Sequence, residues 1–462
     1  MATDSKKTFS TINPATEKEI KQYTYMSQHE LNDGIEKCQK AFLSWRHQSV
    51  ADRAKVIRGV GESLRKNSSK LGALMTEEMG KLLAQSSHEV NLCAGICDYS
   101  ATEAVEIFKP LERKLDAGES GLITYSPLGV IYGIQPWNYP TYQVVRFTIA
   151  SLIAGNGVLL KHASNVTGTT KLLEEIFEEG GLPKNLFTVL IIDHDQSDEV
   201  IENEYVRGVT FTGSAEAGRG IGEKAGKALK KSVLELGSND AYIVLEDADI
   251  KNAVEKCVMG RVYDNGETCI AAKRFIVVDK IYDTFKEAFV KAMSELKIGD
   301  PTTADADLGP MARKDLRKKM HEQVEKSVKN GAEVLCGGKI PEGKEYYYPA
   351  TVLGSVKPGQ PAYDDEIFGS LASLIKAKDE EDAMRIANDS RFGLGGGIFS
   401  KNEKRAVELA PKHFDTGMVF IDKFGLAKPS MPFGGVKDSG FGREHGGFGM
   451  KKFVNVKSII IA

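Results

Sequence analysis

The spacing of apolar residues divides the chain into stretches with different predicted structures. From about residue 27 to 108 the pattern is helical, and Ser27 with Glu30 forms the signature of a capping box at a helix start. One apolar stripe at helical intervals comprises Leu31, Ile35, Cys38, Phe42 and Trp45. A polar stretch from about 109 to 127 ends in the segment LITY at 122–125, which predicts a short strand or hairpin apart from the helices.

Short apolar runs then alternate with helical patterns between residues 128 and 236. The helical patterns cover 166–179 and 215–229. The strand-like runs are 130–134, 158–160, 187–191, 209–212 and 233–236. This alternation is typical of a parallel α/β sheet, the usual host of dinucleotides. A second α/β stretch is predicted from about 237 to 430, with strands at 242–245 and 275–278.

Composition narrows the classes of function. A chain of 462 residues can hold two or three domains, and 41% hydrophobic with 27% charged residues argues against extensive disorder. The net charge of −3 favours neither nucleic acid nor an anionic membrane, and no segment has the length of apolar residues that spans a bilayer. The first residues also lack the apolar core of a secretory signal.

The cysteines point to a reducing cytoplasm rather than to a disulfide scaffold. Six cysteines in so long a chain are too sparse for a disulfide framework. Cys93 and Cys97 form a C-x-x-x-C pair, but no second ligand pair lies nearby, so we expect no metal site.

One cysteine stands in a context that suits catalysis. Cys269 follows a glycine-containing turn in the segment NGETCI at 265–270. An isolated cysteine is more often a small buried hydrophobe. However, oxidation of an aldehyde to an acid needs a nucleophile, an oxyanion donor, a base for water and a hydride acceptor, and a Cys269 thiolate could be the nucleophile.

Two further residues could complete that chemistry. Glu235 ends an apolar run in LELG, and an apolar neighbourhood raises the pKa of a carboxyl so that it can act as a base near neutral pH. An edge residue paired with a lysine is the alternative. Asn138, in the loop PWNYP at 136–140, could donate its amide to a developing oxyanion, or the loop could be a simple turn.

The cofactor signals are moderate when taken singly. FTGS at 211–214 ends a strand and opens a helix, where free backbone N–H groups suit a pyrophosphate, although a simple capped helix would look the same. The segment lacks the glycine pattern of an ordinary dinucleotide fold. Lys161, after the strand 158–160, could bond a ribose or a phosphate, or lie on the surface.

Taken together, these segments resemble the aldehyde dehydrogenase superfamily along the whole chain. The resemblance rests on the order and spacing of several segments, no one of which is decisive. They are NPAT at 13–16, PWNYP at 136–140, LLKHAS at 159–164, FTGS at 211–214, LELG at 234–237, GETC at 266–269, EIFG at 366–369, PFGGVKDSGFGRE at 432–444 and FVNVK at 453–457.

The resemblance implies roles for individual residues. Cys269 would be the nucleophile, Glu235 the general base, and Asn138 the oxyanion donor beside the Cys269 backbone N–H. The residues implied around the cofactor are Ile134, Trp137, Asn138, Lys161, Ser164, Gly213, Ser214, Leu236, Glu366 and Phe368.

The resemblance also implies the α/β fold of that family and its division into domains. A Rossmann-like cofactor domain would comprise 1–108 and 128–236, and an α/β catalytic domain 237–445. A small β extension from 109–127 and 446–462 would join subunits into a homo-oligomer, either a dimer or a tetramer.

Within the family, the chain is most similar to bacterial succinate-semialdehyde dehydrogenases. ELGSND at 235–240, KHAS at 161–164 and the ending FVNVKS carry this similarity. A substrate with a distal carboxylate needs a cation, and Arg146 could grip it with two parallel hydrogen bonds or be an ordinary surface arginine. Asp264, close to the nucleophile, would repel such a carboxylate if it faced the site.

Ser164 bears on the choice of cofactor. Many NAD-preferring relatives have a glutamate at the matching position, which would repel a 2′-phosphate. Ser164 leaves room for this phosphate beside Lys161, so the resemblance implies NADP, with NAD possibly tolerated.

Four other functions stay open at this stage. A coenzyme A-acylating dehydrogenase shares the thioester but needs no water-activating base, so Glu235 counts against it. A non-phosphorylating glyceraldehyde-3-phosphate dehydrogenase would need a phosphate grip, which Arg146 alone does not exclude, and a general aliphatic aldehyde dehydrogenase is a further alternative. A silent binding protein on the same fold would have no need of Cys269, Glu235 and Asn138 together.

Overall fold

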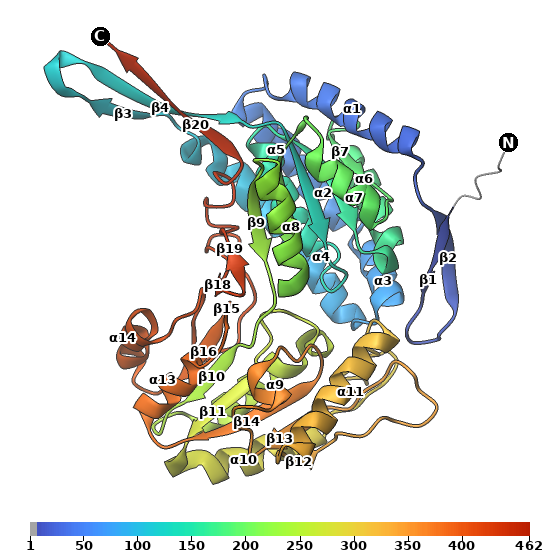
Figure 1. Cartoon of the computed structure of the whole chain (residues 1–462), viewed down its shortest axis with the longest axis vertical. Coiled ribbons are helices and arrows are strands. Elements are labelled where there is room, and N and C mark those ends of the chain that lie inside the picture. The colour runs from blue at the N-terminus through green and yellow to red at the C-terminus, as the bar shows by residue number, and fades with distance from the viewer. Residues whose placement is uncertain (1–6) are drawn as a thin grey trace.

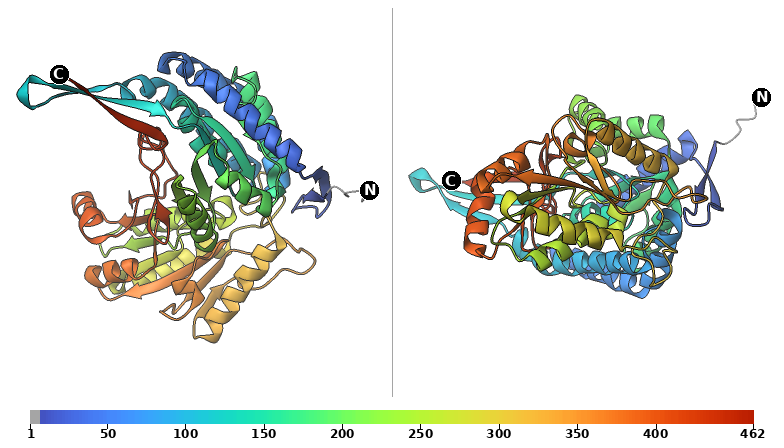
Figure 2. Two further views of the ribbon diagram at one scale, coloured as in Figure 1. Left: turned by 45° about the horizontal axis from the view of Figure 1, so that its top comes forward. Right: turned by 90° about the horizontal axis from the view of Figure 1, so that it is seen from below.

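The computed structural model of the protein describes residues 7–462. Two α/β halves, each built on its own sheet, lie one above the other, and an arm of three strands projects from one end (Figure 1). The turned views show the same arm standing clear of the body, on the side away from the first strands of the chain (Figure 2). This is the α/β architecture that the alternating sequence pattern predicts.

The first half is built on a six-stranded sheet in the order β19-β9-β8-β5-β6-β7. All its neighbours are parallel except β19, which pairs antiparallel with β9. The bounds of its strands are β5 Val130–Gln135, β6 Gly157–His162, β7 Phe187–Val189, β8 Val206–Thr212, β9 Lys231–Glu235 and β19 Gly440–Phe441. Each of the five apolar runs predicted between 128 and 236 forms one of these strands. The observed β7 ends two residues before the predicted run 187–191, and β9 ends one residue before the predicted run 233–236. The observed β8 and β9 begin three and two residues before their predicted runs.

Helices cover both faces of this sheet, which explains why its strands are apolar without alternation. In β6, Val158 and Leu160 pack into one core with α2, α4, α5 and α6, whereas Leu159 packs into another with α1 and α7. The capping box of Ser27 and Glu30 is confirmed at the start of α1. The helices are α1 Gln28–Trp45, α2 Val50–Lys66, α3 Ser68–Met79, α4 Leu83–Ile107, α5 Tyr142–Ile153, the short η2 Ser164–Val166, α6 Thr167–Glu179, α7 His194–Glu202 and α8 Ala215–Lys227.

The second half is built on a seven-stranded sheet in the order β12-β13-β14-β11-β10-β16-β17. It is parallel except for β12, and alternate residues of β11 again pack into two separate cores. Its strands are β10 Ala241–Val244, β11 Arg274–Val278, β12 Glu333–Cys336, β13 Thr351–Gly354, β14 Leu371–Ala377, β16 Gly396–Phe399 and β17 Phe420–Ile421. Its helices are α9 Ile250–Val262, η3 Tyr263–Gly266, α10 Asp279–Ser294, α11 Lys314–Lys329, α12 Pro361–Asp364, α13 Glu380–Asn388 and α14 Glu403–His413.

The projecting arm is a three-stranded antiparallel sheet in the order β20-β4-β3. It joins the stretch predicted as a hairpin, 109–127, to the last strand of the chain. Its elements are β3 Leu111–Lys114, η1 Asp116–Gly118, β4 Ser120–Pro127 and β20 Val454–Ile461. Two small ladders complete the fold, β1 Thr8–Ile12 with β2 Glu19–Thr24, and β15 Phe392–Gly393 with β18 Val436–Lys437.

The sequence did not indicate that a segment after the second sheet returns to pair with the first sheet. β19 lies inside the range 237–445 that the sequence assigns to the catalytic domain, yet it adds an edge strand to the six-stranded sheet. Within residues 7–462, no helix has both the length and the apolar character needed to cross a bilayer. The same residues include no cluster of three or more His, Cys, Asp or Glu side chains arranged to hold a metal ion.

Candidate active site

A cavity of about 790 Å³ lies where the ends of β5 and β8 face residues of the second half of the chain. The carboxyl ends of parallel strands are the usual place for a ligand in an α/β sheet. Eight of the residues predicted from the sequence line this cavity, namely Trp137, Asn138, Gly213, Ser214, Leu236, Cys269, Glu366 and Phe368. They come from five separate segments of the chain, so folding brings together most of the predicted site.

Cys269 lies in a turn after η3 and is partly exposed to this cavity. Burial raises the pKa of its thiol to about 12, while the positive charges of Lys273 and Arg146 lower it. Lys273 Nζ also donates to the backbone oxygen of Cys269 at 2.6 Å, which ties the turn to the start of β11. Lys273 was not predicted from the sequence. Its position four residues after Cys269 is the signal that could have indicated it.

The backbone before Cys269 is unusual. Asp264, Asn265 and Gly266 have φ values of +56°, +55° and +72°, a left-handed run that costs energy at the two non-glycine positions. A Cβ at Gly266 would lie 2.4 Å from the backbone oxygen of Gly369, so this position requires glycine. The structure around Gly369 therefore holds the loop before Cys269 in a left-handed conformation that asparagine and aspartate tolerate better than other non-glycine residues.

Asn138 reaches the same loop from the end of β5. Its side-chain Nδ2 donates to the backbone oxygen of Glu267 at 3.0 Å, and its own backbone oxygen accepts from Lys81 Nζ at 3.0 Å. An amide nitrogen has two N–H donors, so one remains for a substrate oxygen beside Cys269. This arrangement can stabilise negative charge on that oxygen.

Glu235 ends β9 and is fully buried. Neither carboxylate oxygen has a hydrogen-bond partner among residues 7–462. Burial raises the pKa of this carboxyl well above its ordinary value, and the nearby Glu444 raises it further, against the lowering effect of Arg146. Backbone approaches it closely, because a Cβ at Gly434 would lie 2.8 Å from Glu235 Oε1. A buried carboxyl with unsatisfied oxygens and a raised pKa has the properties of a general base.

Arg146 does not line the cavity. Its guanidinium is buried, forms an ion pair with Glu444, and donates from Nη2 to Thr212 Oγ1 at 3.0 Å. Its Nη1 has no hydrogen-bond partner in the described chain. The positive charge of Arg146 lowers the pKa of both Cys269 and Glu235. Its role in gripping a substrate carboxylate stays a prediction.

Asp264, which could have repelled a substrate carboxylate, does not line the cavity either. Its carboxylate is buried and forms an ion pair with Lys81 at 3.2 Å. Burial raises its pKa to about 7 even though Lys81 opposes the shift.

Other residues that line the same cavity have the features of a nucleotide site. Ser214 is the N-cap of α8 and accepts from the Ala217 N–H at 3.2 Å, so the helix presents its free N-terminus to the cavity. Trp137 and Phe368 form a wall there, with ring centroids 5.8 Å apart and planes at 89°. These groups suit a phosphate and a planar ring respectively, and so they fit a nicotinamide dinucleotide.

Glu366 lies against the backbone of Gly237, where a side chain would not fit. Its Oε1 accepts from the Ser238 N–H at 2.9 Å, and a Cβ at Gly237 would lie 2.4 Å from its Oε2. Burial raises the pKa of Glu366, and Lys273, at 3.9 Å, lowers it. Leu236 and Ile134 belong to one apolar cluster with Phe211, but only Leu236 lines the cavity of about 790 Å³, and Ile134 lines neither cavity of the site.

A second cavity of about 320 Å³ contains the remaining two predicted cofactor residues. Lys161, at the end of β6, and Ser164, at the start of η2, both line it. Arg313 lines this cavity and the larger one, so the two adjoin. Lys7 also lines the smaller cavity, where it pairs with Asp193 at 2.9 Å.

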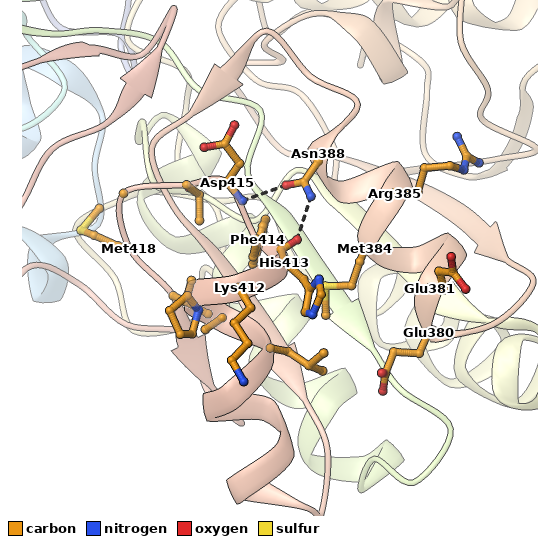
Figure 3. Close-up of a pocket in the computed structure, with 16 residues that line it drawn as sticks. Glu380, Glu381, Met384, Arg385, Asn388, Lys412, His413, Phe414, Asp415 and Met418 are labelled. Carbon is orange, nitrogen blue, oxygen red and sulfur yellow. Dashed lines mark hydrogen bonds between the residues drawn. The ribbon is translucent and has the colours of Figure 1, made fainter.

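A third cavity, of about 890 Å³, lies over α13 and the end of α14 (Figure 3). Its wall is held by Asn388, which donates to the His413 backbone oxygen at 2.7 Å and accepts from the Asp415 N–H at 2.8 Å. None of the residues predicted for the site lines it. Its greater volume therefore does not make it the candidate site.

Comparisons with known proteins agree with this geometry. The model of the "Aldehyde dehydrogenase family" matches residues 1–459. A succinate semialdehyde dehydrogenase [NAD(P)+] of Escherichia coli is 41% identical over 97% of this chain and 96% of its own. A succinate-semialdehyde dehydrogenase [NADP(+)] of Mycobacterium leprae is 39% identical over 98% of this chain and 99% of its own.

The fold matches solved structures equally well. The succinic semialdehyde dehydrogenase of Streptococcus pyogenes, solved with NADP+, has a TM-score of 0.95 and 36% identity, covering 98% of this chain and 99% of that chain. The matches extend over almost the full length of both partners, and five of the resembling segments, PWNYP, FTGS, LELG, GETC and EIFG, contribute residues to the cavity of about 790 Å³ that contains Cys269. The chain belongs to the aldehyde dehydrogenase family.

Proposed function

We propose that the protein oxidises succinate semialdehyde to succinate with NADP+ as the hydride acceptor, through a thioester on Cys269. The observation that carries this proposal is the meeting of the Cys269 thiol, the Asn138 amide and the open N-terminus of α8 in one cavity. The names of the relatives in E. coli and M. leprae support the substrate and the cofactor.

The first chemical step uses Cys269 and Asn138. Burial raises the pKa of the Cys269 thiol, and the positive charges of Lys273 and Arg146 act against this shift and so favour the thiolate that attacks. The thiolate forms a bond from Sγ to the aldehyde carbon, and the Asn138 amide donates to the oxygen on which negative charge develops. When bound, NADP+ supplies the acceptor for the hydride that leaves this carbon.

The second step uses Glu235. The carboxylate takes a proton from water, the resulting hydroxide adds to the acyl carbon of the thioester, and the bond from Sγ to that carbon breaks. Succinate leaves and the cysteine is restored. Neither oxygen of Glu235 has a hydrogen-bond donor among residues 7–462, which supports this role, because a buried carboxylate without donors has a raised affinity for a proton.

Arg146 is our candidate for recognition of the distal carboxylate. Its support is the buried guanidinium, which has no partner at Nη1 among residues 7–462 and donates from Nη2 to Thr212 in the cavity wall. Glu444 already neutralises part of its charge, so we expect its contribution to come from geometry as much as from charge.

A panel of aldehydes tests this function directly. We expect the highest kcat/KM with succinate semialdehyde and NADP+, lower values with butyraldehyde and glyceraldehyde 3-phosphate, and no dependence on coenzyme A. A requirement for coenzyme A, or a clear preference for either other aldehyde, would refute the substrate and leave the family unchanged. Cys269→Ala is the control for adventitious activity.

We infer in addition that the protein is a homo-oligomer joined through its arm. The support is a row of apolar side chains on β20 that face solvent in the single chain, with exposures of 58% at Val456 and 67% at Ile460. Apolar rows of this kind on soluble proteins usually mark an interface. Analytical ultracentrifugation should give a dimer or tetramer, and Ile460→Asp should weaken it; a monomeric wild type contradicts the inference.

We also infer that the protein works in a reducing cytoplasm. All six cysteines are free, and Cys269 must stay reduced to act as a nucleophile. Fractionation of cells that express the chain should recover the activity with cytoplasmic markers. Recovery with membranes or in the medium contradicts this.

A further inference from the structure

A fully buried lysine lies between the two loops that hold Asn138 and Cys269. Lys81 is in the turn 80–82 between α3 and α4, and its side chain is 1% exposed. The turn is fixed against the second half of the chain, because Gly80 has φ +83° and a Cβ there would lie 2.5 Å from the Pro310 backbone oxygen. Lys81 therefore has a defined place at the junction of the two halves.

The ammonium of Lys81 contacts three different segments. Nζ donates to Glu89 Oε2 at 2.5 Å and to the Asn138 backbone oxygen at 3.0 Å, and it forms an ion pair with Asp264 Oδ2 at 3.2 Å. It also lies 3.8 Å from the centre of the Tyr139 ring, within the range of a cation–π contact. Two hydrogen bonds, an ion pair and a ring contact together over-determine the position of the ammonium.

Glu89 extends this link to the far side of the Asn138 loop. Its Oε1 accepts from the backbone N–H groups of Thr141 and Tyr142, each at 2.8 Å, where α5 begins. Lys81 and Glu89 together thus hold the backbone at residue 138 and at residues 141–142. Asp264, the third partner, starts the left-handed run that leads to Cys269.

We propose that Lys81 is a positioning residue for the oxyanion site: it fixes the backbone of Asn138, and so the direction of the Asn138 amide, relative to the Cys269 loop. An oxyanion donor works only at about 2.7–3.1 Å from the developing charge, and a misplacement of about 1 Å can cost about a hundredfold in rate. This inference rests on the roles proposed above for Asn138 and Cys269.

The decisive experiment is a double-mutant cycle with Lys81→Met and Asn138→Ala. Asn138→Ala removes the side-chain amide but keeps the backbone oxygen that Lys81 binds. A purely structural effect of Lys81 would therefore persist in the Asn138→Ala background, whereas an effect through the amide would vanish. The readout is the single-turnover rate of nicotinamide reduction, with Kd for NADP+ measured separately by fluorescence.

We expect Lys81→Met to lower the single-turnover rate on the order of tenfold to a hundredfold, with Kd for NADP+ little changed. In the Asn138→Ala background, the same change should cost less than about threefold more. Lys230→Met is the matched control, because Lys230 also binds two backbone oxygens, of Asn203 and Val206, away from the site. It should keep the wild-type rate.

Several outcomes overturn the proposal. A loss from Lys81→Met that is equally large in both backgrounds would make Lys81 a structural residue only, and an unchanged rate would exclude any role. If Lys81→Met does not fold, Lys81→Met/Glu89→Gln replaces it, because glutamine can still accept from residues 141 and 142; failure of both to fold also assigns Lys81 to stability alone. If Asn138→Ala itself keeps the wild-type rate, the proposed role of Asn138 fails, and that of Lys81 with it.

Discussion

Replacement of Ser164 by glutamate should reverse the preference for NADP over NAD. Ser164 and Lys161 line the same cavity of about 320 Å³. In that cavity Lys7 is already paired with Asp193, and Arg313 bonds Asp315, which leaves Lys161 as the cation best placed for a 2′-phosphate. Ser164→Glu would place a carboxylate beside it.

The volume of the cavity gives the scale of the effect. A volume of 320 Å³ corresponds to a sphere about 8.5 Å across, so about 8 Å is a representative separation between a 2′-phosphate inside it and the new carboxylate. Two unit charges at about 8 Å interact by roughly 2 kcal/mol at an effective dielectric near 20, and salt reduces this to about 0.8 kcal/mol. A phosphate carries about −1.5 to −2 charge, so the penalty is about 1.2–1.5 kcal/mol, or roughly tenfold in affinity.

Binding measurements test this without reference to turnover. We expect wild type to bind NADP+ more tightly than NAD+, and Ser164→Glu to lose about tenfold or more in NADP+ affinity while NAD+ affinity holds or improves. Ser164→Gln, of similar size but uncharged, is the control for steric effects. Added salt should partly restore NADP+ binding to Ser164→Glu alone. Equal shifts in both variants, or a wild-type preference for NAD+, would refute the electrostatic reasoning.

Three further predictions concern the chemical steps and the substrate. Glu235→Gln should slow deacylation by about a hundredfold or more while acylation persists, so a burst of reduced cofactor should precede a slow steady state; equal losses in both phases would contradict its role as hydrolytic base. The steady-state rate of wild type should rise with pH, because only the ionised form of Glu235 acts as a base and burial raises its pKa; a pH profile that Glu235→Gln leaves unchanged would disprove this cause. Arg146→Lys keeps the charge but loses the planar guanidinium, so KM for succinate semialdehyde should rise about tenfold and that for butyraldehyde should not; equal changes would make Arg146 structural.

The parts of the molecule that could be predicted from the sequence are those set by local pattern. Strands buried on both faces appear as continuous apolar runs, so β5, β6 and β8 were recognised near their true bounds. The residues that follow such strands gather at one edge of the sheet, and this is why Asn138 and Ser214 share a cavity.

The parts that could not be predicted depend on partners far away in the chain. Lys81 meets Asp264 across 183 positions, and Arg146 meets Glu444 across 298, so neither pairing has a local signal. A lysine in a turn is usually exposed, and nothing near Lys81 in the sequence indicates that it is buried. The same reasoning applies to Asp264. From the sequence alone its charge would repel an anionic substrate, but in the structure it is paired with Lys81.

The central claim is that the acyl group is carried by Cys269, and the most direct test is to isolate that intermediate. Glu235→Gln should be mixed with succinate semialdehyde and NADP+, quenched in acid during the slow phase, digested and analysed by mass spectrometry. The account predicts a succinyl group on the peptide that contains Cys269, released by hydroxylamine and absent from Glu235→Gln/Cys269→Ala. Full reduction of NADP+ with no adduct on Cys269, or an adduct on another cysteine, would contradict it.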